Sequence, residues 1–146
     1  MGSEVASRIV ARNEEELRVL EARLHDEQID LSRQHHDSDA GTVSWPTRVL
    51  GDEGRLRWGL GKWGLWRYPF LAATLVVGNV ITLTVEDNAH IGAADISTLA
   101  YANGILTIES GIDVRIKIQV ERLHVELLIH PQVVGQRSFF GSEPNV

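Results

Sequence analysis

Apolar and polar residues alternate strictly from residue 112 to residue 120. Apolar side chains occupy the even positions of this stretch, and the odd positions hold Asp113, Arg115, Lys117 and Gln119. A period of two is typical of a β-strand, because successive side chains point to opposite faces. The stretch is therefore predicted to be a strand with one face on a core and one in water.

A hairpin is predicted immediately before this strand. Residues 95–102 and 105–109 flank Asn103-Gly104, the strongest two-residue signal for a tight hairpin turn, because both residues tolerate positive φ. Further strands are predicted at 45–50, 55–60, 63–68, 70–77 and 80–85. Gly78-Asn79 between the last two predicts a second hairpin, with a type II′ turn.

The apolar parity changes after Val120, from even positions to Leu123, Val125, Leu127 and Ile129. Glu121 and Arg122 lie at the change, and neither suits the positive φ of a tight turn. A β-bulge within one long, bent strand explains the change, because one extra residue re-aims every later side chain. Pro131 is predicted to end that strand, which leaves residues 131–146 as a C-terminal tail.

One helix is predicted near the N-terminus, over residues 14–27. Asn13 is a favoured N-cap residue, and Glu16 follows three residues later, as a capping box requires. Leu17, Leu20 and Leu24 form one narrow apolar stripe, so the helix should pack on a single surface. A short strand is predicted before it, at residues 5–11.

These elements predict a mainly β (α+β) fold: an antiparallel sandwich or partly open barrel of about eight strands, with one N-terminal helix packed on it. The length of 146 residues suits a single domain. Its parts would be the strand and helix at 5–27, a polar loop at 34–42, a β-rich body at 43–130 and the tail.

Composition removes several classes of protein. The chain has no cysteine, which excludes disulfides and thiolate chemistry and fits a reducing, cytoplasmic location. A net charge of −6 argues against nucleic acid as a partner. Residues 68–85 carry no charge, but Pro69, Gly78 and Asn79 favour two buried strands over a membrane span.

Aromatic and basic residues gather in one segment. Residues 54–68 contain four basic residues and no acid, so the rest of the chain has ten basic and 20 acidic residues, a net charge of −10. Such a segment is typical of a surface that binds a partner's side chains, a base or a sugar. The alternative is that tryptophans fill the core. The candidate binding residues are Arg57, Trp58, Lys62, Trp63, Trp66, Arg67 and Tyr68.

The same segment contains Gly59, Gly61 and Gly64, which formally match the dinucleotide-binding pattern G-x-G-x-x-G. That motif requires its last glycine to open a helix, whereas Gly64 is followed by a strand-like run that reaches Pro69. We therefore predict no cofactor.

Two clusters of histidine and carboxylate are weighed as chemical sites. His35, His36, Asp37 and Asp39 are a candidate metal site, because imidazole and carboxylate groups can share a cation. The alternative is a solvated polar loop. The second cluster is His124, Glu126 and His130, whose even positions place their side chains on one face of a strand. This face is predicted to be either a proton-transfer site or the solvent-exposed face of the strand. A third group, Glu86-Asp87-Asn88 with Asp95, is a candidate carboxylate pair for hydrolysis or Ca²⁺, but its spacing matches no EF-hand loop. Its position between two strands favours turn-forming residues instead.

The sequence therefore favours a non-catalytic module that binds a protein partner or its own copies. The alternative is a small metal-dependent or histidine-using enzyme. No membrane partner is expected.

The metal hypothesis predicts a response to zinc. If His35 and His36 bind a cation, Zn²⁺ should raise the melting temperature by mass action, because it binds only the folded state. The double variant His35→Ala, His36→Ala should lose that response in a thermal melt. A parent protein whose melting temperature is unchanged at saturating Zn²⁺ would contradict the hypothesis.

Overall fold

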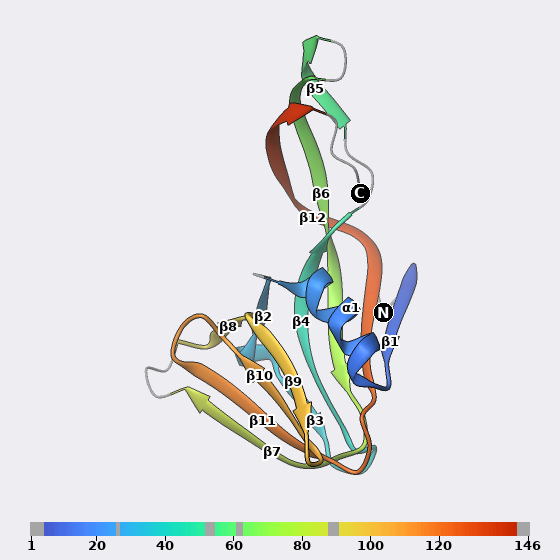
Figure 1. Cartoon of the computed structure of the whole chain (residues 1–146), viewed down its shortest axis with the longest axis vertical. Coiled ribbons are helices and arrows are strands. Elements are labelled where there is room, and N and C mark those ends of the chain that lie inside the picture. The colour runs from blue at the N-terminus through green and yellow to red at the C-terminus, as the bar shows by residue number, and fades with distance from the viewer. Residues whose placement is uncertain (1–4, 26, 52–54, 61–62, 88–90, 143–146) are drawn as a thin grey trace.

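The computed structural model describes residues 5–25, 27–51, 55–60, 63–87 and 91–142, and side chains within all of these except 55–60 and 139–142. The elements in chain order are β1 (Ser7–Ala11), α1 (Glu14–Leu24), β2 (Gln28–Asp30), a 3-10 turn η1 (Leu31–Arg33), β3 (His35–Asp37), β4 (Thr42–Leu50), β5 (Arg55–Leu60), β6 (Trp63–Val77), β7 (Val80–Asp87), β8 (Ala93–Asp95), β9 (Thr98–Ala102), β10 (Ile105–Glu109), β11 (Val114–Val120) and β12 (Val125–Ser142). Figure 1 shows their arrangement.

The strands form two main antiparallel sheets that share one core. The larger sheet has the order β1-β12-β6-β4-β3, with β5 added beside β6, and the smaller has the order β7-β11-β10-β9. The core cluster draws side chains from both sheets and from α1, among them Trp45, Leu75, Ile116 and Leu20. A mainly β fold with one N-terminal helix is confirmed, and the described strands form open sheets, as in a sandwich.

Helix α1 begins as its sequence predicts. The Asn13 side chain accepts a hydrogen bond of 2.8 Å from the Glu16 amide, and Glu16 Oε1 accepts one of 2.9 Å from the Arg12 amide. The first bond satisfies an amide that the first turn of a helix leaves without a partner, and the second holds the backbone just before the N-cap. Leu17, Leu20 and Leu24 are fully buried, and the helix ends at Leu24, three residues before the predicted end.

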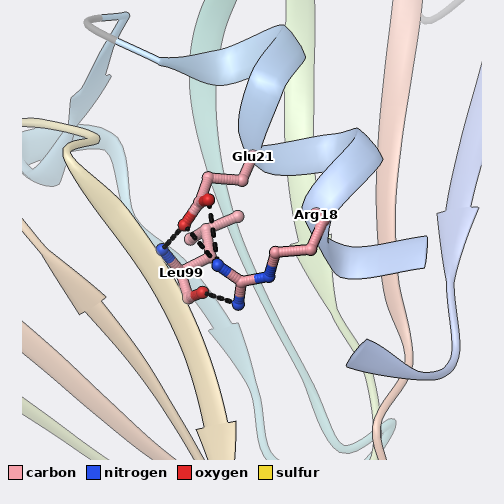
Figure 2. Close-up of polar contacts among 3 residues, drawn as sticks. All are labelled: Arg18, Glu21 and Leu99. Atoms are coloured by element: carbon pink, nitrogen blue, oxygen red, sulfur yellow. Dashed lines mark hydrogen bonds and ion pairs between the residues drawn. The ribbon is translucent and has the colours of Figure 1, made fainter. Parts of the chain in front are cut away.

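The helix also closes one edge of the smaller sheet (Figure 2). Glu21 Oε2 accepts a 2.7 Å hydrogen bond from the Leu99 amide, and Arg18 Nη2 donates one of 2.5 Å to the Leu99 carbonyl. An ion pair of 2.9 Å joins Arg18 to Glu21. An edge strand exposes unpaired backbone groups that can pair with another chain, so the Arg18–Glu21 pair protects β9 at this position.

The Asn103-Gly104 hairpin is confirmed. Ala102 is paired with Ile105, and both turn residues have positive φ, 54° and 77°. Both values match a type I′ turn, whose twist suits the flanking strands.

The second predicted hairpin is wrong. Gly78-Asn79 carries the chain from β6 in the larger sheet to β7 in the smaller one. The predicted bulge at Glu121 and Arg122 is also wrong, because the chain there leaves β11 and enters β12 of the other sheet. The parity changes because the chain changes sheet, and both sheets must direct apolar side chains into the same core.

The two crossings lie against each other. The Gly78 amide donates to the His124 carbonyl at 2.8 Å, and the Glu121 amide donates to the Asn79 carbonyl at 2.9 Å. Asn79 has a φ of 55°, and its side-chain amide donates to the Arg122 carbonyl at 3.3 Å. Two neighbouring strands therefore pass between the sheets as a hydrogen-bonded pair.

Two further predictions are wrong. Pro131 does not end the last strand, because β12 continues to Ser142 and its register against β6 shifts between Ile129 and Gly135. A proline is tolerated in a strand at such an irregularity, where a backbone donor is not needed. The predicted loop at 34–42 contains β3, which pairs with the start of β4.

Long strands project from the body as an arm. We define the arm as β5 together with residues 63–70 of β6 and 135–142 of β12. Strand β6 lies in its centre, with β12 along one side and β5 along the other. In Figure 1 the arm extends away from the two sheets and α1 along the longest axis of the molecule.

The cap predicts a stability effect. Asn13→Ala should lower the free energy of unfolding by about 1 kcal/mol, because it removes the acceptor of the Glu16 amide. The measurement is a urea denaturation midpoint, with Asn13→Asp as the matched control that keeps an acceptor. Equal midpoints for the parent and Asn13→Ala would show that this bond contributes little.

Candidate functional site

The arm contains the aromatic and basic segment that the sequence singles out. The strands of the arm hold four basic residues, Arg55, Arg57, Arg67 and Arg137, and no acidic residue. Removing these four from the 14 basic residues of the chain leaves ten against 20 acidic residues, a net charge of −10. The structure thus separates a basic projection from an acidic body.

Strand alternation divides the candidate residues of β6 between two faces. Trp63 and Arg67 lie on one face, and Trp66 and Tyr68 lie on the other. Trp63 is 53% exposed, which makes it the exposed aromatic side chain of the described part of the arm. Tyr68 is buried, with 4% of its surface exposed, so a partner cannot contact it without a rearrangement.

Trp66 lies half-buried beside Tyr68. Its indole Nε1 is buried and has no hydrogen-bond partner in the part of the chain that the structure describes. An unpaired buried donor costs free energy, on the order of 1–3 kcal/mol. Trp66 therefore contributes packing to the arm at the cost of a buried indole donor.

Phe70 fixes the base of the arm. The Arg48 guanidinium lies 4.0 Å from the centre of the Phe70 ring, and the Arg137 guanidinium lies 5.8 Å from it. Such cation–π contacts favour the arrangement by about 0.5–2 kcal/mol. No local sequence pattern points to Arg48 or Arg137, because their approach to Phe70 depends on the pairing of β4 and β12 with β6.

The remaining candidates of this segment are placed only in part. Arg57 and Trp58 belong to β5, whose side chains lie outside the described residues, and Lys62 lies outside them entirely. Trp45, the fourth tryptophan, is fully buried in the core, and its indole donates to Gln34 Oε1 at 2.9 Å. Trp45 thus belongs to the core and not to the exposed aromatic group.

The candidate metal ligands occupy a short hairpin. His35 and His36 are neighbours on β3, so their side chains point to opposite faces. Asp37 Oδ1 accepts hydrogen bonds of 3.1 Å from the amides of Asp39 and Ala40. These bonds are typical of an aspartate that stabilises a turn. Within the described ranges, no three His, Asp or Glu side chains gather as a metal site.

The histidines of β12 and the residues before it have separate partners. His124 Nε2 lies 2.9 Å from Glu126 Oε1, and the other Glu126 oxygen lies 3.8 Å from Arg8. His130 Nε2 lies 3.0 Å from the Thr74 hydroxyl. The predicted shared face thus holds two separate polar pairs, one of which couples a histidine to a carboxylate.

The carboxylates near β7 and β8 stabilise turns. Asp87 accepts hydrogen bonds of 2.9 Å from the amides of Ile91 and Gly92. Asp95 accepts a hydrogen bond from the Ser110 hydroxyl and one of 3.3 Å from the Gly111 amide. The Ser110 bond is the largest cause that lowers the pKa of Asp95 below 3.8, and the Gly111 amide acts in the same direction against desolvation.

Comparison of the chain with protein-family models, curated proteins and solved structures gives no match. Within the described ranges, no helix has the length and apolar character needed to cross a membrane. The interpretation of the arm therefore depends on its own geometry and charge.

The lowered pKa of Asp95 predicts an acid dependence. A carboxyl group with a depressed pKa in the folded state stabilises the fold above its unfolded pKa, and that contribution is lost as the pH falls through the folded value. Ser110→Ala should raise the pKa of Asp95 toward 3.8 and reduce its share of the stability lost below about pH 4. Carboxyl NMR titration and unfolding at several pH values measure both effects. An unchanged Asp95 pKa in the variant would contradict this assignment.

Proposed function

We propose that the protein is a non-catalytic binding module whose arm docks on an acidic surface of a protein partner. The observation that carries the proposal is the position of Trp63, half-exposed on a basic strand that extends beyond the body. The chain's acidic residues lie outside the arm strands, so the arm and the body differ in the sign of their charge.

The chemistry of the arm suits binding. Tryptophan and arginine are the side chains most enriched among residues that dominate binding energy, because they bury a large area with few rotatable bonds. Trp63 and Arg67 share one face of β6, so one partner surface can meet an aromatic ring and a cation together. The opposite face contributes Tyr68 and Phe70 to packing, which holds the exposed face in place.

Charge explains why the partner surface should be acidic. A basic projection attracts an acidic surface and raises the rate of encounter, while the acidic body repels the same surface. The contact would therefore be made by the arm in preference to the body. Because exposed charges are screened by salt, binding should weaken as ionic strength rises.

The first prediction from this proposal concerns accessibility. Iodide should quench the fluorescence of Trp63 and leave Trp45 unquenched, because the exposed fractions of the two side chains are 53% and 0%. Single Trp→Phe variants assign the quenched signal. A native protein in which Trp63→Phe leaves the quenched fraction unchanged would remove the exposed aromatic contact from the proposal.

Binding is tested with matched variants of the full chain. Trp63→Ala should weaken capture of the partner by about 2 kcal/mol, roughly 30-fold, while the melting temperature changes little. Ile105→Ala is the control, because Ile105 is 40% exposed on the smaller sheet, away from the arm. Supporting results are a protein retained by the parent and by Ile105→Ala, lost with Trp63→Ala and Arg67→Glu, and released by salt. Equal capture by all four chains contradicts the proposal.

A second copy of the chain also presents an acidic body. Sedimentation equilibrium of the parent and of Trp63→Ala separates this case from a distinct partner. A dimer that dissociates in Trp63→Ala would assign the arm to self-association and would overturn the proposal of a separate protein partner.

A further inference from the structure

A hollow lined by two arginines lies where the chain passes between the two sheets. Its volume is 560 Å³, and it is lined by Arg12, Asn79, Arg122, Leu123 and His124. The lining residues that the structure describes thus include two arginines, a histidine and an amide, and no carboxylate. This volume is within the range of small-molecule sites.

The two arginines differ from most other arginines of the body. Arg33, Arg48 and Arg115 each have a guanidinium nitrogen within 4.0 Å of a carboxylate oxygen. In the part of the chain that the structure describes, the guanidinium groups of Arg12 and Arg122 make no hydrogen bond or ion pair. Their donors are therefore available to a ligand.

The other polar side chains are held in place by the crossing. Asn79 uses one amide hydrogen on the Arg122 carbonyl, at 3.3 Å, and keeps the second. His124 Nε2 lies 2.9 Å from Glu126 Oε1, and this contact holds the imidazole ring beside the hollow. Two carboxylates of this region are already engaged, since Glu126 contacts His124 and Arg8, and Glu16 accepts from the Arg12 amide.

The backbone around the hollow is fixed by bonds between both crossings. The Gly78 amide bonds to the His124 carbonyl and the Glu121 amide bonds to the Asn79 carbonyl. Leu123 is buried, with 6% of its surface exposed, and anchors the residues on either side of it. The backbone at Asn79 and His124 is thus held by hydrogen bonds, which limits the conformational entropy that these residues lose when a ligand binds.

We propose that this hollow binds the phosphate group of a small molecule. Guanidinium groups recognise phosphate and carboxylate oxygens through paired hydrogen bonds. Donors from three side chains, Arg12, Arg122 and Asn79, match the several oxygens of a phosphate better than the two of a carboxylate. The site is independent of the arm, because none of its residues belongs to β5, β6 or β12.

The test uses inorganic phosphate as the probe and acetate as a carboxylate probe, both at constant ionic strength maintained with chloride. Backbone amide NMR shifts of Asn79, Arg122, Leu123 and His124 should change and saturate with phosphate. Arg12→Gln and Arg122→Gln should each weaken binding about tenfold, because each removes charged donors. The double variant should abolish saturable binding, and Arg115→Gln is the control that should bind like the parent.

Three results would overturn the proposal: no saturable shift with phosphate, equal affinity in the parent and the double variant, or acetate binding as tightly as phosphate. Trp63→Ala should bind phosphate like the parent. A failure of the phosphate site is therefore distinguishable from a failure of the arm to bind protein.

Discussion

Two neighbouring strands cross together from one sheet to the other, and the rest of the structure depends on that crossing. Residues 78–79 link β6 to β7, residues 121–124 link β11 to β12, and backbone hydrogen bonds of 2.8 and 2.9 Å join the two links. If the two sheets were separate layers, each would expose one apolar face to water, whereas the two links bring these faces together. The crossing makes a single core possible, and α1 covers part of it with Leu17, Leu20 and Leu24.

The two ends of the larger sheet differ in what their side chains pack against. Toward the crossing, β4, β6 and β12 direct alternate side chains such as Val43, Leu75 and Leu127 into the core. Beyond Phe70 the same β6 and β12 leave the body, and their side chains have no second sheet to pack on. The packing of the body does not explain an exposed Trp63 on such a projection, and the proposal of a binding surface rests on this exposed side chain and the basic charge of the arm.

Many polar side chains of the body make contacts that stabilise the fold. Arg18 and Glu21 protect the edge strand β9, Asp87 and Asp95 hold turns, and Arg48 joins Glu27 while lying over Phe70. Arg12 and Arg122 differ from these residues, since both line a hollow beside the hydrogen-bonded crossing with their guanidinium groups unpaired among the described residues. The two proposed binding surfaces are therefore distinct in position and in chemistry, one suited to a protein surface and the other to a phosphate.

The sequence by itself determined the local structure: the Asn13 cap, the leucine stripe of α1, the Asn103-Gly104 turn and the two-residue period of β11. It also located the basic, aromatic segment, since those signals depend on residues close in the chain. Tertiary structure alone decided that Gly78-Asn79 and residues 121–124 change sheets, and that β12 passes Pro131 to pair with the arm. It also decided which of the described tryptophan side chains is exposed, and it brought Arg12 to Arg122. Turn propensity and side-chain parity are the same whether a strand returns to its own sheet or enters another, and that choice is made by burial of both sheets in one core.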